Sequence, residues 1–140
     1  WRVEQAKRNR IVFSVEAHVG SLVPRPKEAL RLVHSVPSLT LTLDYTHFTC
    51  AGLPDSTVEP LIAHASPFHA RGACKGRLQA SFQQNTIDYA QVLRAMQRTD
   101  YQGYVGVEYV WVDWEHCNEV DNLSETIQLR DFLRANRPTR

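Results

Sequence analysis

The stretch Leu39-Thr-Leu-Thr-Leu-Asp44 alternates leucine with threonine and ends on an aspartate. Because successive side chains of a β-strand point to opposite faces, this alternation predicts a strand with one aliphatic face and one small, polar face. Asp44 falls on the polar face, at the carboxyl end of the strand. A doubly wound sheet is apolar on both faces and fits this pattern less well. The stretch therefore favours a barrel, whose aliphatic outer face packs against helices.

Strand and helix patterns alternate on both sides of this stretch. Short apolar or β-branched runs predict further strands at 11–16, 66–70 and 104–110, and helical spacing of apolar residues predicts helices at 26–34, 55–63, 86–98 and 121–135. About four strand–helix units in succession indicate an α/β fold with a parallel sheet. A complete (β/α)8 barrel needs ~250 residues, so 140 residues predict part of such a barrel.

Cap residues and apolar spacing predict further details of the helices. Thr86 is the expected cap of the helix at 86–98, and Asp55 the expected cap of the helix at 55–63. Leu123, Ile127 and Leu133 are expected to form the buried side of the last helix.

Three of the four predicted strands carry a carboxylate at or near the carboxyl end. These residues are Glu16, Asp44 and Glu108, and the weaker strand at 66–70 ends near His69. The alternation of the strands places the three carboxylates on the same inner face, at the edge where parallel sheets bind ligands. Converging carboxylates repel each other unless a cation compensates them. The set suits one divalent ion such as Mn²⁺, Mg²⁺ or Co²⁺, with Zn²⁺ also possible. Each residue taken alone has a simpler alternative, a solvated or hydrogen-bonded role.

Ser14-Val-Glu-Ala-His18, Leu43-Asp-Tyr-Thr-His47, Phe68-His-Ala-Arg-Gly72 and Tyr101-Gln-Gly-Tyr-Val-Gly-Val-Glu108 follow one another along the chain. In this order they resemble the last four strands of the sugar phosphate isomerase/epimerase family, whose barrels are xylose isomerase-like. The stretch Asn85-Thr-Ile-Asp88 resembles the family's usual lead-in to the following helix. The resemblance extends from about Ile11 to Leu133. It implies that residues 1–140 are a single domain or fragment, the C-terminal half of a TIM barrel.

The resemblance also implies roles for individual residues. Glu16, Asp44, His69 and Glu108 would bind the metal ion, and the two glutamates would be the catalytic acid/base pair. The implied reaction is the isomerisation or epimerisation of a sugar or related polyhydroxy carbonyl compound. Removing the proton next to the carbonyl gives an enediolate, whose charge a metal ion stabilises. One carboxylate takes this proton and the other returns it.

Three further residues are implied to bind substrate. His47 matches the family position that hydrogen-bonds a substrate oxygen, with packing in a loop as the alternative. Lys75 lies where epimerase relatives often carry an arginine that contacts substrate. Together with Arg71 and Arg77 it could hold a phosphate or carboxylate group, with a solvated loop of three cations as the alternative.

The sequence differs from the family pattern in the segment after Glu16. Ketose 3-epimerases usually carry another acidic substrate contact there, but residues 18–23 contain no acid. His18 could take its place. The departure argues against a simple ketose 3-epimerase.

Composition bears on partners and on localisation. The 16 basic and 15 acidic residues leave a net charge of +1, which gives no reason to expect nucleic acid or an anionic membrane as a partner. No apolar run approaches the ~20 residues that span a bilayer. Cys50, Cys74 and Cys117 form no Cys-x-x-Cys pair, so we expect a reducing cytoplasm.

Three other functions remain open at this point. An inosose-type dehydratase would share the scaffold and the metal ligands. A zinc phosphodiesterase of the endonuclease IV type would need further ligands and a basic DNA-binding surface. A non-catalytic, barrel-derived module would need neither.

The beginning of the chain predicts that it is part of a longer protein, and its four strand–helix units predict a further half-barrel or subunit packed against them. The chain opens without Met, at Trp1, inside an amphipathic stretch that is typical of the tail of a helix. We therefore expect it to be part of a longer protein. Four units alone leave an inner face and two sheet edges uncovered. Either a homo-oligomer or the N-terminal half of the same barrel is expected to cover them.

Overall fold

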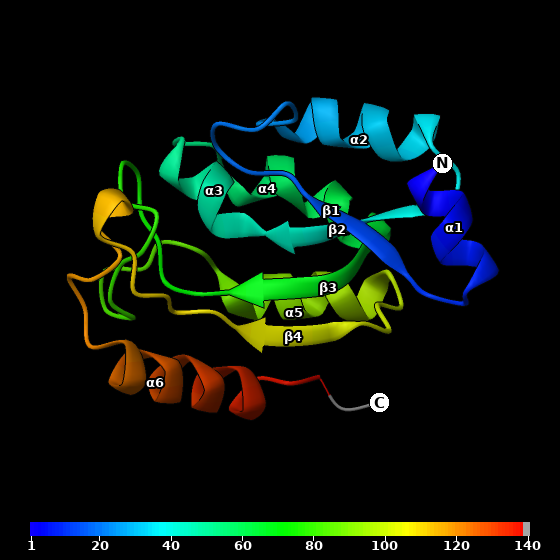
Figure 1. The fold of residues 1–140 in the computed structure, drawn as a ribbon. Helices are drawn as coiled ribbons and strands as arrows, with labels where there is room; N and C mark the ends of the chain where they lie inside the picture. Colours follow the sequence, from blue (N-terminus) through cyan, green and yellow to red (C-terminus); the bar gives the residue numbers. More distant parts are fainter. Residues whose placement is uncertain (139–140) are drawn as a thin grey trace.

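The computed structural model describes residues 1–138 and contains one parallel sheet with strand order β1-β2-β3-β4 (Figure 1). The strands are β1 (Phe13–Glu16), β2 (Leu39–Asp44), β3 (Ala65–Ala70) and β4 (Tyr104–Val107). Each strand pairs in parallel with the next along the chain, and Asp44 lies opposite His69. The prediction of four parallel strands alternating with helices is confirmed.

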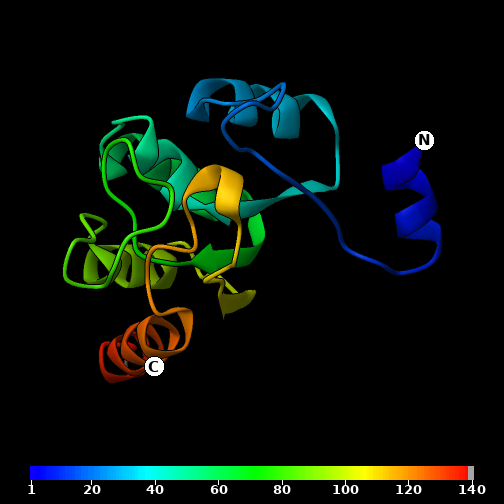
Figure 2. The same cartoon turned by 60° about the vertical axis from the view of Figure 1, so that its left-hand side comes forward.

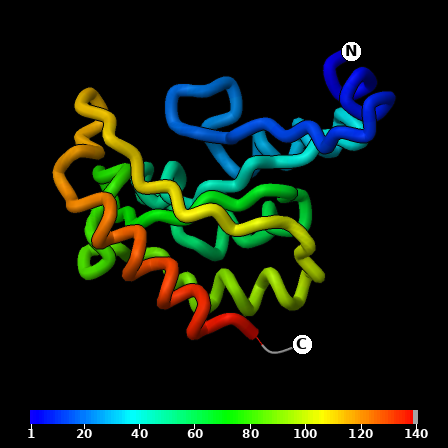
Figure 3. The backbone as a smooth tube through the Cα atoms, turned by 60° about the horizontal axis from the view of Figure 1, so that its bottom comes forward, coloured from blue at the N-terminus to red at the C-terminus, as the bar shows by residue number. Residues whose placement is uncertain are grey.

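Helical segments connect the strands and form an arc around the sheet (Figure 2). They are α1 (Arg2–Arg8), α2 (Pro26–Ser35), α3 (Tyr45–Cys50), α4 (Asp55–Val58), α5 (Tyr89–Arg98) and α6 (Asn122–Ala135), with short 3-10 helices η1 (Glu59–His64) and η2 (Asp113–Glu115). Helices α5 and α6 lie on the same side of the sheet (Figure 3). Among the described residues, no helix combines the length and the apolar character that crossing a membrane requires.

The two faces of β2 differ as its alternation predicts. Leu41 and Leu43 are fully buried in the core between the sheet and the helices. Burying one leucine side chain contributes about 1.5–3 kcal/mol. On the other face, the hydroxyl of Thr40 is 2.7 Å from that of Ser66, and the hydroxyl of Thr42 is 2.8 Å from that of Ser14. Small hydroxyl side chains therefore link three neighbouring strands on the inner face.

Helix α3 was not predicted from the sequence. It begins directly after β2, and the Asp44 side chain caps it by accepting a hydrogen bond from the backbone N–H of Thr46 at 2.8 Å. Its sequence, Tyr-Thr-His-Phe-Thr-Cys, consists of residues with modest helix propensity. Burial of five of its six residues stabilises the helix instead.

Two predicted caps are wrong. Helix α5 is capped by Asp88, whose carboxylate accepts from the Gln91 N–H at 2.9 Å, and not by Thr86. Pro54 holds the cap position of α4, while the Asp55 carboxylate accepts from the Asp88 N–H at 2.9 Å. The helix predicted at 55–63 is also shorter, because α4 gives way to the 3-10 helix η1, which carries a proline in its first turn.

The predicted buried side of the last helix is only partly correct. Leu123 and Ile127 are 71% and 40% exposed, whereas Leu129 is fully buried. Phe132 and Leu133 pack partly against the core, with the ring of Phe132 5.4 Å from that of Phe82. Only the second half of α6 therefore packs on the core.

Gln79 ties the segment after β4 to the loop after β3. Its side chain is buried, donates to the carbonyls of Val110 (3.0 Å) and Cys117, and accepts from the Val110 N–H at 2.9 Å. The substitution Gln79→Leu would leave these groups without partners, so we expect a loss of about 2–3 kcal/mol in the free energy of unfolding. Urea titration measures it. The exposed Gln83 supplies the control, Gln83→Leu, expected within about 0.5 kcal/mol of the parent. Equal losses would contradict this role.

Candidate metal centre

The carboxyl ends of the four strands lie at one edge of the sheet, where the arrowheads in Figure 1 point. Glu16 ends β1, Asp44 ends β2, and His69 is the penultimate residue of β3. Glu108 directly follows β4, and its N–H donates to the carbonyl of Ala70 at 2.9 Å, which extends the pairing of the two strands. The fold thus brings all four predicted metal ligands to the same edge.

Glu16, His69 and Glu108 form one compact group. His69 Nδ1 lies 3.0 Å from an oxygen of Glu108 and 3.7 Å from an oxygen of Glu16. One ligand atom from each residue lies within 4.8 Å of the other two. Two carboxylates and one imidazole, all half-buried, form a donor set that a hard to borderline divalent ion accepts.

Glu16, Asp44 and His47 form a second group that shares Glu16 with the first. His47 Nε2 lies 3.7 Å from Glu16 and 3.7 Å from Asp44. His47 is buried in helix α3, not in a loop, and its role in packing or in binding substrate stays a prediction. His18 is also close, since its ring centroid is 5.3 Å from that of His47.

The surroundings of two histidine ring nitrogens indicate whether these residues fit a metal ion. Among the described residues, Nδ1 of His47 and Nδ1 of His69 are buried and lack a hydrogen-bond partner. Nδ1 of His69 lies within ion-pair distance of both Glu16 and Glu108, but without the geometry of a hydrogen bond. A buried polar atom without a partner costs free energy. A divalent ion between the three side chains would use this nitrogen together with the two carboxylates. The first group therefore fits such an ion.

The charged groups shift each other's pKa. Contacts with the carboxylates of Glu108 and Glu16 raise the pKa of His69 to about 10. Contacts with His47 and His69 lower the pKa of Glu16, and contact with His69 lowers that of Glu108. In the metal-free state, a protonated His69 therefore supplies the positive charge between two carboxylates. A metal ion has to displace this proton, since only a neutral imidazole binds metal.

Asp44 is fully buried, and donors of the protein bind both of its oxygens. Oδ1 accepts from the N–H and the hydroxyl of Thr46 at 2.8 and 2.7 Å. Oδ2 accepts from Arg71 at 3.2 Å. Asp44 is not part of the compact group around His69. The four-ligand set thus stays a prediction, of which three members lie together and the fourth lies beside them.

The three cations after β3 have different surroundings. Arg71 is 4% exposed and binds Asp44, whose buried charge needs a counter-ion. Lys75 is exposed, and its Cε lies 3.3 Å from where a Cβ on Gly52 would stand. Arg77 is ion-paired with Glu119. Arg71 is therefore placed to orient Asp44, and the shared phosphate or carboxylate site stays a prediction.

Two tyrosines that were not predicted from the sequence hold the backbone beside Arg71. The Tyr89 hydroxyl accepts from the N–H of Arg71 at 3.0 Å and donates to its carbonyl at 2.7 Å. The Tyr109 hydroxyl accepts from the N–H of Gly72 at 2.9 Å. A tyrosine next to Glu108 and another at the beginning of α5 were the available signals, but nothing in their spacing indicates this contact.

The strand–helix units form a curved parallel sheet, and carboxylates and imidazoles lie at its carboxyl edge. This arrangement is typical of TIM-barrel enzymes. The chain belongs to the xylose isomerase-like TIM barrel family, whose sequence profile matches residues 2–136. The resemblance inferred from the sequence is thereby confirmed. A search among curated proteins gave no match.

Three solved structures of sugar 3-epimerases or an epimerase-like protein are similar to this chain. L-ribulose 3-epimerase has a TM-score of 0.75 at 14% identity, with 96% of this chain and 50% of that chain covered. D-allulose 3-epimerase from Methylomonas sp. has a TM-score of 0.70 at 15% identity, with 96% and 51% covered. A D-tagatose 3-epimerase-like protein has a TM-score of 0.61 at 22% identity, with 92% and 51% covered. At these identities the likeness concerns the fold, and the chain spans about half the length of each protein.

Glu16 belongs to both groups, so its loss should affect metal binding most directly. Glu16→Gln keeps the shape of the side chain but removes its charge. We expect the affinity for Mn²⁺ to fall by roughly 100-fold or more, because second-sphere changes alone cost about 10–100-fold. Isothermal titration calorimetry measures the affinity. Glu115→Gln, at an exposed glutamate of η2, is the matched control and should bind like the parent. Unchanged affinity in Glu16→Gln would rule out this site.

Proposed function

We propose that the chain carries part of the active site of a divalent-metal-dependent isomerase or epimerase that acts on a sugar or related polyhydroxy carbonyl compound. The observation that carries the proposal is the pair of carboxylates, Glu16 and Glu108, on either side of His69 Nδ1. The family and the fold shared with sugar 3-epimerases support the substrate class. Because the chain spans about half the length of these proteins, the proposal concerns the site that its own residues form.

The two glutamates would divide the proton transfer. One removes the proton next to the substrate carbonyl. The other returns a proton to the opposite face of the same carbon in an epimerase, or to the neighbouring carbon in an isomerase. One ligand atom of each lies within 4.8 Å of the other, so both carboxylates lie beside the same part of the site. Contacts with His69 lower the pKa of both carboxyls, so the glutamate that acts as the base is ionised. The other glutamate has to be protonated before it can return a proton to the substrate.

The neighbouring side chains would bind the substrate and the ion. His47, buried beside Glu16, is proposed to hydrogen-bond a substrate oxygen, and the exposed Lys75 to contact the substrate from the rim. Glu16, His69 and Glu108 would hold the metal ion, with Asp44 as the proposed fourth ligand. When bound, the ion supplies positive charge beside the enediolate oxygens. The donors suit Mn²⁺, Mg²⁺ or Co²⁺, and Zn²⁺ is also compatible.

Metal analysis and isotope exchange test the proposal. The purified protein should bind about one divalent ion per chain, whereas a phosphodiesterase cluster would hold two or more. Incubated with Mn²⁺ and a panel of ketoses in D₂O, it should exchange a carbon-bound proton next to the carbonyl of at least one sugar. Proton NMR detects this exchange. Chelation should stop it. A metal-loaded protein that exchanges no proton in any ketose would contradict the proposal.

A further inference from the structure

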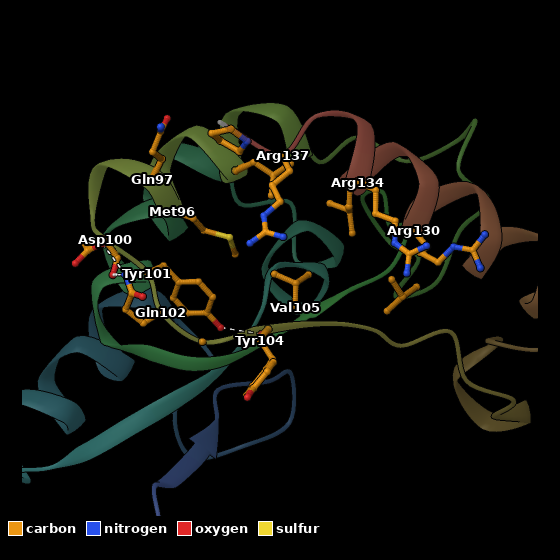
Figure 4. Close-up of a pocket in the computed structure, with 15 residues that line it drawn as sticks. Met96, Gln97, Asp100, Tyr101, Gln102, Tyr104, Val105, Arg130, Arg134 and Arg137 are labelled. Carbon is orange, nitrogen blue, oxygen red and sulfur yellow. Dashed lines mark hydrogen bonds between the residues drawn. The ribbon is translucent and has the colours of Figure 1, made fainter. Parts of the chain in front are cut away.

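A pocket of about 500 Å³ lies between α5 and α6, over the beginning of β4 (Figure 4). Its lining includes Tyr104, Val105 and Val107 of β4 but none of the residues of the candidate metal centre. The pocket is thus separate from the candidate metal centre. Its volume is in the range of small-molecule sites, ~300–1,000 Å³. Apolar side chains form much of its wall, namely Leu93, Met96, Tyr101, Val105, Val107 and Leu133.

Three arginines line the pocket from the end of the chain. Arg130, Arg134 and Arg137 follow one another at intervals of four and three residues, so they share one side of α6 and its extension (Figure 4). Arg130 is ion-paired with Asp131 at 2.8 Å. Within residues 1–138, no carboxylate pairs with Arg134 or Arg137. Neighbouring like charges at this spacing destabilise a helix unless an anion compensates them.

The facing wall of the pocket carries one acidic residue. Asp100 lines this wall, and one oxygen of its carboxylate accepts a hydrogen bond from the Gln102 side chain at 2.6 Å. The same wall is held in place, since the Tyr101 hydroxyl donates to the carbonyl of Ser66 at 2.7 Å. At Gly103 an added Cβ would lie 1.7 Å from that carbonyl, so only glycine fits this close approach. The cavity is therefore pre-formed, positively charged on one side and apolar beneath.

We propose that this pocket binds a small amphipathic anion, with its phosphate or carboxylate held by Arg134 and Arg137. Guanidinium groups bind such anions through two parallel hydrogen bonds, which a lysine cannot reproduce. The aromatic or aliphatic body of the ligand would lie on Met96, Val105 and Leu133. The enclosure by α5, α6 and the turn at 100–103 suits a compact ligand better than an extended polypeptide. This inference does not depend on the proposed enzymatic activity.

Titration of the ¹⁵N-labelled 140-residue chain with two probes tests the proposal. The probes are 1-naphthyl phosphate, an aromatic phosphate, and decanoate, an aliphatic carboxylate, and the tighter binder identifies the body that the pocket prefers. We expect amide shifts at residues 93–107 and 130–137 that saturate below about 1 mM for at least one probe. Inorganic phosphate lacks the apolar body, and 2-naphthol lacks the anionic group. Each should bind at least roughly ten-fold more weakly.

Two double variants distinguish binding in the pocket from general attraction of an anion to a positively charged protein. The double variant R134Q/R137Q should weaken binding of the preferred probe by at least roughly ten-fold. The double variant R2Q/K7Q removes the same charge from exposed positions of α1 and should change binding less than about two-fold. The proposal is overturned if neither probe binds at about 1 mM. It is equally overturned if both double variants bind alike, or if the shifts lie on the inner face of the sheet.

Discussion

Replacing Glu108 with glutamine is expected to slow proton exchange into the substrate by roughly 10²–10⁴-fold, the usual contribution of a positioned acid or base. The amide has nearly the shape of the carboxylate and can still donate or accept hydrogen bonds, but it cannot take up a proton at neutral pH. Glu108 lies 3.0 Å from His69 and is half-buried, so its carboxylate has a defined position in the site. Exchange of deuterium from D₂O into a responsive ketose, followed by NMR, measures the rate.

Two controls give this result its meaning. The assay is run at saturating Mn²⁺ with the metal content measured, so that a weaker ion affinity is not mistaken for a lost base. Glu115→Gln makes the same chemical change at an exposed glutamate after β4 and should keep the parent rate. A metal-loaded Glu108→Gln protein whose rate stays within about ten-fold of the parent would show that Glu108 does not transfer the proton.

The substitution Arg71→Met is expected to lower the free energy of unfolding by about 3–5 kcal/mol, because it leaves the Asp44 carboxylate buried without its counter-ion. Asp44 has no exposed surface, and Arg71 donates to it at 3.2 Å and to the hydroxyl of Thr46 at 3.2 Å. Methionine keeps a similar apolar volume, so the loss reports mainly the charge. Urea unfolding followed by circular dichroism measures it.

The same loop offers a matched control for Arg71. Arg77→Met removes an arginine that is also ion-paired, with Glu119, but both partners of this pair are about two-fifths exposed. Exposed pairs contribute about 0–1 kcal/mol. The loss in free energy of unfolding is therefore expected to be several-fold larger for Arg71→Met than for Arg77→Met. Equal losses would mean that the buried Asp44 carboxylate does not depend on Arg71 as its counter-ion.

The strands could be predicted from the sequence because their alternation is regular and in phase with their charged ends. β2 was predicted with its full bounds, since leucine and threonine alternate over its whole length. The same alternation placed Glu16, Asp44 and Glu108 at one sheet edge, as the structure has them. Helix α3 could not be predicted, because burial against the sheet stabilises it and its residues have little helix propensity of their own.

The details of the site depended on contacts across the fold, which a sequence does not reveal. The Arg71–Asp44 pair joins residues 27 apart, and only the parallel pairing of β2 and β3 brings them together. As isolated loop residues, Arg71, Lys75 and Arg77 had the pattern of an anion site. Leu123 and Ile127 had the spacing of a core stripe, but α6 packs on the core through its second half.

The most direct test of the account is a crystal structure of the protein grown with Mn²⁺, with anomalous difference density recorded near the manganese absorption edge. The account predicts one strong peak at the carboxyl edge of the sheet, within about 2.5 Å of oxygens of Glu16 and Glu108 and of His69 Nδ1. It also predicts that Asp44 completes the set. A protein without a peak there at saturating Mn²⁺, or with its only peak on other residues, would contradict it.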